Sequence, residues 1–323
     1  MMLDVPHPSA RVEVPAPGGP VGAGIEPGAV SFGPASSEPV PMRLWIMSDL
    51  RVDLAPFDLP DTPPDFDAVI VAGGIGPGLS RSVRWLAQAL DGHRRDRPVV
   101  LVPGPAEFLD GVPVAEALAE AVPLARSLGI ALLHDASVRL GDPTSCGIHV
   151  LGATLWPSFA VDGAANERQA RAHARHRWSV RARATSAPGV PFYPHDAAGG
   201  HHRSRAYIED ALSSVVAGGY GHTPDPVVAG IRGGDRAVVV TAYPPSRSCL
   251  PPTLARPLLD PWRVCWHVSD LDGVMEAWGA PVAWVHGQVP AACDLRIGRT
   301  RVVSNPHVRD PTAGFDPRRT IFV

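Results

Sequence analysis

The stretch VVLVPGPAEF, residues 99–108, joins an unbroken apolar run to a loop that opens with a proline and a glycine. Consecutive aliphatic residues without alternation are typical of a strand that is buried on both faces in a parallel sheet. Glycine at the carboxyl end of such a strand permits a tight turn, and ligand sites commonly lie at these strand ends. Pro105 and Ala106 can neither bind a metal nor transfer a proton, so the loop has a functional position without functional side chains.

Similar short apolar runs alternate with segments of helical spacing along the rest of the chain. Strands are predicted over residues 44–47, 68–72 and 98–102, within 130–134 and 148–156, and over 237–242, 281–287, 293–298 and 300–306. Helices are predicted over 81–90, 114–129, 203–217 and 267–278, with Pro123 as a kink or break in the second. Buried strands separated by helices indicate an α/β fold with a partly mixed sheet.

The composition narrows the class of protein. The 323 residues are 45% hydrophobic, and a net charge of −3 gives no reason to expect nucleic acid or an anionic membrane as partner. All 29 basic residues are arginine, and the four cysteines lack the paired spacing of zinc sites. We interpret the cysteines as scattered core thiols. No run approaches a membrane span and no secretory signal is visible, so a cytoplasmic protein without membrane contact is expected.

Two segments differ from the rest. Residues 1–41 are rich in Pro, Gly, Ala and Ser, which predicts a disordered leader before a domain over 42–323, and translation can start at Met1 or at Met42. Residues from about 160 to 202 form an Arg-rich insertion. This insertion is interpreted either as a solvated face or as a basic helix for an acidic partner.

Five loops at predicted strand ends align in a recognisable order. They are SDLR (48–51), AGGI (72–75), PGPAEF (103–108), TAYPPS (241–246) and VHGQVP (285–290). In order and spacing they resemble the signature loops of the calcineurin-like metallophosphoesterases, D-x-H, G-D, G-N-H-E, a strand-end His and G-H-x-H. The resemblance implies a four-layer α/β/β/α sandwich with a dinuclear metal site at the strand ends.

The same resemblance implies that this site has lost most of its ligands. Asp49 is the only clearly retained ligand-type residue, and the degenerate positions are Asp49, Arg51, Gly74, Pro105, Ala106, Ala242, Gln288 and Pro290. Arginine has no lone pair to donate, and glycine, proline and alanine have no ligand atom in their side chains. No catalytic residue, metal or other cofactor is therefore expected.

Three functions stay open at this point. The first is a pseudoenzyme with a binding or regulatory role, whose partner is a protein or a small anionic ligand. In it Arg51 pairs with Asp49, and Arg51, Tyr243, His286 and Gln288 line an anion-binding cleft; alternatively, Arg51 only neutralises a buried Asp49. The second is a residual metal-dependent phosphoesterase acting on phosphomonoesters or phosphodiesters, with Mn, Fe, Zn or Ni. The third is a pure protein-interaction module.

Overall fold

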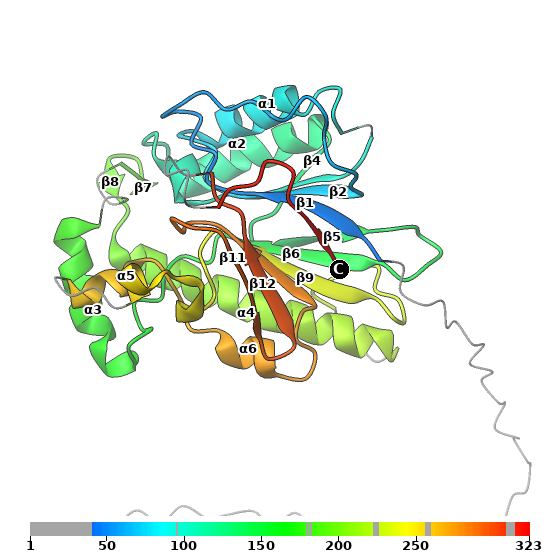
Figure 1. Ribbon diagram of the computed structural model, residues 1–323. Coiled ribbons are helices and arrows are strands. Elements are labelled where there is room, and N and C mark those ends of the chain that lie inside the picture. Colours follow the sequence, from blue (N-terminus) through cyan, green and yellow to red (C-terminus); the bar gives the residue numbers. More distant parts are fainter. Residues whose placement is uncertain are drawn as a thin grey trace, which may run out of the picture. The chain divides into compact units, whose positions relative to one another are not determined.

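A computed structural model describes residues 41–94, 96–178, 180, 183–221, 226–255, 260–307 and 314–323 (Figure 1). They belong to one compact unit, Ser36–Val323. The predicted disordered leader, residues 1–41, lies outside the described residues except for Pro41. Within the described ranges, no helix combines the length and the apolar character needed to cross a bilayer.

The first four strands of the chain and its last strand build a five-stranded sheet. Its order is β13-β1-β2-β3-β4, and the strands β1 to β4 are parallel while β13 pairs antiparallel with β1. The bounds are β1 Arg43–Met47, β2 Ala68–Ala72, β3 Val99–Val102, β4 Ile130–Leu132 and β13 Thr320–Phe322. The helices α1 (Leu79–Ala89) and α2 (Val114–Ser127) connect these strands, and α2 continues through Pro123 without a break.

Strands within the range from β5 to β12 build a six-stranded sheet in the order β11-β12-β10-β9-β6-β5. Its four inner strands are parallel, and β11 and β5 pair antiparallel at the two edges. The bounds are β5 Ala136–Leu140, β6 Ile148–Ala153, β9 Arg236–Thr241, β10 Ala283–His286, β11 Cys293–Ile297 and β12 Thr300–Ser304. The prediction of a mixed α/β fold is therefore confirmed.

Successive side chains of each buried strand point to opposite faces of its sheet, and they divide the core into three hydrophobic clusters. On one face of the first sheet, residues such as Trp45 and Val69 pack with α1 and α2. The opposite face, with Leu44 and Ile70, packs against residues of the six-stranded sheet. Trp284 and the remaining face of that second sheet pack with α4 (Pro194–Gly219) and α6 (Asp272–Glu276), which cover it in Figure 1. Strands buried on both faces explain the unalternating apolar runs.

The insertion folds onto the rest of the unit. It contains α3 (Ala164–Arg177), the short pair β7 (Thr185–Ala187) and β8 (Val190–Pro191), and the start of α4. The buried side chains of Ala170 and Ala174 join the cluster that covers the first sheet, while most Arg side chains of α3 are exposed or half-buried. Helix α4 begins earlier than the predicted residue 203.

The predicted helix over 267–278 is replaced by a shorter one. Within that range, which the structure describes in full, the one helical element is the five-residue α6, and the 3₁₀ turn η4 (Pro261–Trp266) ends just before the range begins. Residues 267–271 have no helical structure, and the N–H groups of Ser269 and Leu271 bond to the carbonyls of Pro244 and Pro245. These tertiary hydrogen bonds outweigh the local helical spacing. Two further 3₁₀ or α-helical turns, η3 (Arg247–Cys249) and α5 (Pro252–Ala255), precede η4.

Candidate functional site

The parallel strands of both sheets point their carboxyl ends toward one cavity of about 430 Å³. Side chains from loops that are far apart in the sequence line it, since they follow β1, β2, β3 and β10. Seven of the eight degenerate positions lie on its wall: Asp49, Arg51, Gly74, Pro105, Ala106, Gln288 and Pro290. The eighth, Ala242, is buried beneath the glycine turns, with its Cβ 3.1 Å from where a Cβ of Gly104 would lie.

The backbone around the cavity is held in uncommon conformations. Asp49, Arg51 and Gln288 have φ values of 55°, 44° and 57°, in the left-handed region that non-glycine residues rarely adopt. The N–H of Asp49 and that of Arg51 bond to the carbonyls of Gly73 and Gly74, at 2.9 Å each. Conformations of this kind each cost about 1–3 kcal/mol and cluster at functional sites.

Gly74 has no room for a larger residue. Its φ is +80°, and an added Cβ would lie 2.6 Å from the Cα of Asp49. The resemblance treats this position as one that has lost a carboxylate. In this structure the close approach of the two loops itself requires glycine there.

Asp49 points its carboxylate into the junction between the loops. Its Oδ2 accepts a 2.9 Å hydrogen bond from the backbone N–H of Gln288. Burial raises the pKa of the Asp49 carboxyl to about 7, and the Glu107 charge adds to this effect against the opposing Gln288 N–H. The junction therefore favours the protonated carboxyl group more than water does.

The Glu107 side chain connects the loop after β2 to the loop after β3 through hydrogen bonds. Residues Pro105–Phe108 form the 3₁₀ turn η1, and the Glu107 side chain is fully buried. Its Oε2 accepts N–H bonds from Gly104 at 2.7 Å and Gly74 at 3.2 Å, and its Oε1 accepts one from Ile75 at 2.6 Å. Burial raises its pKa, although these three donors act in the opposite direction. Glu107 therefore has a structural role in fixing the loops after β2 and β3.

Arg51 does not pair with Asp49, which corrects both versions of the sequence prediction. Its guanidinium forms a two-pronged ion pair with Asp53, with Nε–Oδ1 at 2.9 Å and Nη2–Oδ2 at 2.8 Å. The left-handed backbone at Arg51 and the short spacing to Asp53 favour this local pair. Asp49 is instead accommodated by its raised pKa and by the Gln288 N–H.

The predicted anion-binding set is only partly assembled. Arg51 and Gln288 line the main cavity, and Gln288 and Tyr243 line an adjoining cavity of about 320 Å³. Tyr243 is 1% exposed, and burial raises the pKa of its hydroxyl. His286 is fully buried and lines neither cavity; its Nε2 lies 3.4 Å from Cys293 Sγ instead.

Sequence reasoning missed two residues that line both cavities, Arg263 and His267. They lie in or just after η4, outside the strand-end loops that the motif search follows. Burial lowers the pKa of His267 to about 4, with a smaller contribution from the Arg263 charge. His267 is therefore neutral at pH 7. A third imidazole, His307, lies on the loop after β12 and contacts the main cavity.

The described residues of the cleft do not assemble a metal-ligand set. Asp49, His267 and His307 are the carboxylate and imidazole groups on the main cavity. Among the described residues, three or more ligand atoms come within 4.8 Å of one another in a single group, Cys249, His286 and Cys293, which is outside the cleft. This group also corrects the interpretation of all four cysteines as scattered thiols. The expectation that the cleft binds no metal stays a prediction.

Comparisons with known proteins find a similar structure but no similar sequence. No family model matches the chain, and no curated protein sequence matches it. A solved structure of phosphopantetheinyl hydrolase from Mycobacterium tuberculosis superimposes with a TM-score of 0.57. The two chains are 18% identical over 84% of this chain and 93% of the hydrolase, so the likeness shows the fold alone.

These findings correct the family that the loop motifs imply. The absence of any matching family model removes the sequence support for the calcineurin-like metallophosphoesterases, and the structural neighbour is named as a phosphopantetheinyl hydrolase. The chain is therefore not assigned to that superfamily. What holds is a mixed α/β fold similar to that of a hydrolase.

Proposed function

We propose that the cleft binds a small anionic ester, a phosphate or sulfate with an apolar body, and that the chain is a pseudoenzyme with a binding or regulatory role. The observation that carries this proposal is the composition of one cavity wall, on which the described residues place two guanidinium groups, Arg51 and Arg263, and one carboxylate, Asp49. We also infer that the helices and two sheets stack as α/β/β/α layers, which leaves the strand ends of both sheets free to form this cleft.

The charges favour an anion. Arg51 is oriented by Asp53, and Arg263 is exposed and forms no ion pair with any described residue. Asp49 is the one carboxylate among the described residues of the cavity wall, and Asp53, outside the wall, is the counter-ion of Arg51. With a pKa of about 7, Asp49 loses its charge on modest acidification. An oxyanion can therefore accept hydrogen bonds from guanidinium donors with little repulsion from the floor of the cleft.

The remaining wall favours an apolar group beside the anion. Leu50, Leu54, Leu109, Leu254 and Val289 all line the same cavity. The structural neighbour is named as a hydrolase of phosphopantetheinyl groups, and a phosphoryl-containing ligand is consistent with the class proposed here. At 18% identity, none of that enzyme's residues is transferred to this chain.

The side chains of the cleft support binding of the ester without its hydrolysis. Pro105 and Ala106 provide neither nucleophile nor proton, and His267 is neutral at pH 7 and so is a poor general acid. A metal-dependent hydrolase would need several ligands around one point, whereas the described residues of the cleft offer one carboxylate and separate imidazoles.

Calorimetric titration with phenyl sulfate tests the proposal, since its charge does not change between pH 5 and pH 8. We expect saturable binding, weakened about tenfold to a hundredfold by Arg263→Gln because a charge-assisted hydrogen bond contributes about 1.5–3 kcal/mol. Arg205→Gln is the matched control, since Arg205 pairs with Glu209 on α4, away from the cleft. No saturable heat, or equal affinity in Arg263→Gln and wild type, would overturn the proposal.

A further inference from the structure

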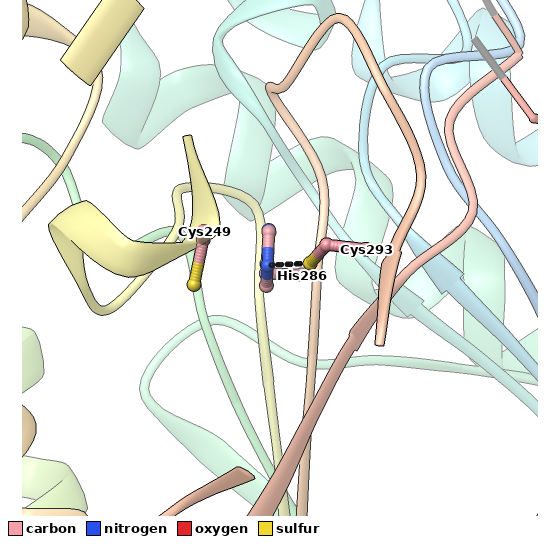
Figure 2. Close-up of side chains that lie close together, drawn as sticks. All are labelled: Cys249, His286 and Cys293. Carbon is pink, nitrogen blue, oxygen red and sulfur yellow. Dashed lines mark hydrogen bonds between the residues drawn. The ribbon is translucent and has the colours of Figure 1, made fainter. Parts of the chain in front are cut away.

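A second site lies outside the cleft, where two cysteines and a histidine come close together (Figure 2). Cys249 is in η3, His286 ends β10, and Cys293 begins β11, so 44 residues of sequence separate the two sulfurs while their ligand atoms are within 4.8 Å of each other and of the imidazole. Figure 2 shows the Cys293 sulfur pointing at His286, with the Cys249 side chain beside the same imidazole. From the geometry of these groups we propose a site for a single thiolate-binding metal ion, with zinc as the ion it fits.

The spacing suits zinc. Bonds of about 2.3 Å to sulfur and 2.0–2.1 Å to nitrogen at a tetrahedral angle place the two ligand atoms about 3.5 Å apart. Cys293 Sγ and His286 Nε2 are 3.4 Å apart. The ligands therefore need little rearrangement to bind an ion, and two sulfurs and one imidazole are a donor set that zinc accepts while a fourth position takes water.

The imidazole is oriented for ligation. His286 Nδ1 lies 3.1 Å from the carbonyl oxygen of Gly287, so Nδ1 carries the proton and donates there. The lone pair of Nε2 then points toward Cys293 Sγ. Metal-binding histidines are typically fixed in this way, with the second nitrogen donating to a carbonyl or a carboxylate.

The surroundings offer partners for a sulfur ligand and negative charge that a cation would balance. Ser304 Oγ donates to Cys293 Sγ at 3.3 Å, and the pairing of Cys293 with Ser304 across β11 and β12 holds this contact in place. Asp272 adds a negative charge near Cys249, and its buried Oδ1 has no hydrogen-bond partner among the described residues. Cys249 is 3% exposed and His286 0%, so the ion would be largely shielded from solvent.

Cobalt is the probe that tests this site, because thiolate coordination gives Co²⁺ a charge-transfer band in the near ultraviolet. The protein is stripped with chelator under reductant and titrated with Co²⁺, then with Zn²⁺. We expect the band to saturate at about one ion per chain, as one cluster allows, and to disappear when Zn²⁺ displaces the cobalt. Absence of the band in the wild-type protein would overturn the proposal without any variant.

Variants locate the ion. Cys249→Ser and Cys293→Ser should each lose the band and the rise in melting temperature that Zn²⁺ gives to the wild type. Cys146→Ser is the matched control and should keep both, because Cys146 lies beside Gly233 and not in the cluster. Persistence of the band in Cys293→Ser would place the ion elsewhere and refute the site. Circular dichroism checks that each variant is folded, and phenyl sulfate binding by Cys293→Ser separates this site from the function of the cleft.

Discussion

Replacement of Asp49 by asparagine should change how the stability of the protein depends on pH. The folded state raises the pKa of Asp49 from 3.8 to about 7, chiefly by burial. A carboxyl group with a raised folded-state pKa contributes stability that is fully present below the unfolded pKa and is lost as the pH rises through the folded one. Ionisation of Asp49 therefore destabilises the wild type between about pH 4 and pH 7.

The shift sets the size of the effect. At about 1.4 kcal/mol for each pKa unit, it corresponds to about 4 kcal/mol once both states have titrated. Asparagine can still accept the Gln288 N–H through its amide oxygen, but it does not ionise. We expect the free energy of unfolding of Asp49→Asn to gain up to about 4 kcal/mol relative to wild type between pH 4 and pH 8.

Urea unfolding followed by tryptophan fluorescence at intervals across that pH range measures the difference. Asp58→Asn is the matched control, since Asp58 is an exposed carboxylate that follows the same strand. The difference in free energy of unfolding between Asp49→Asn and wild type should change with pH, whereas the difference between Asp58→Asn and wild type should stay constant. Parallel curves for the two proteins would refute the argument that Asp49 is buried in a form that resists ionisation.

Three further predictions concern the residues that shape the site. Glu107→Ala should lower the free energy of unfolding by about 3–5 kcal/mol in urea titrations, because three buried N–H groups lose their acceptor. Gly74→Asp should cost about 2–4 kcal/mol and gain no bound metal by elemental analysis, since its Cβ would overlap Asp49; unchanged stability would show that the loops can separate. Asp235→Ala should cost about 3–5 kcal/mol and leave phenyl sulfate affinity unchanged, because its partners include Arg139 and His149 at the opposite end of the second sheet.

The pH dependence of Asp235 has the opposite sign to that of Asp49. Burial would raise its pKa, but hydrogen bonds led by the Arg139 guanidinium outweigh burial and hold the pKa at about 2. Its contribution to stability is present above the unfolded pKa of 3.8 and is lost as the pH falls through about 2. Acid unfolding below pH 4 should therefore be less steep in Asp235→Ala than in wild type.

The sequence predicts the framework of the fold well, because buried parallel strands have a strong signal. The runs at 44–47, 68–72 and 99–102 are strands, and their carboxyl ends form one cavity as the loop positions suggest. The strands β5 and β13 are missed, since ASVRL is half-buried and TIF is only three residues long at a sheet edge. Such edge strands are determined by their partners more than by their own pattern.

From the sequence, the residues of the site could be predicted only where they lie in loops directly after those strands. Arg51 lies in the expected loop, but its partner depends on a left-handed backbone that the sequence does not reveal. Arg263 and the cluster around His286 come together through tertiary packing of segments distant in the chain. The family resemblance, which depends on short motifs, is not supported by any sequence match.

Phosphorus NMR of phenyl phosphate mixed with an equimolar amount of the protein tests the central claim most directly, because one spectrum reports both binding and turnover. We predict that the ester resonance shifts or broadens with wild type, that this change is much reduced in the Arg51→Gln, Arg263→Gln double variant, and that no inorganic phosphate appears. A sharp, unshifted ester resonance would contradict binding in the cleft, and a growing inorganic phosphate resonance would contradict a pseudoenzyme.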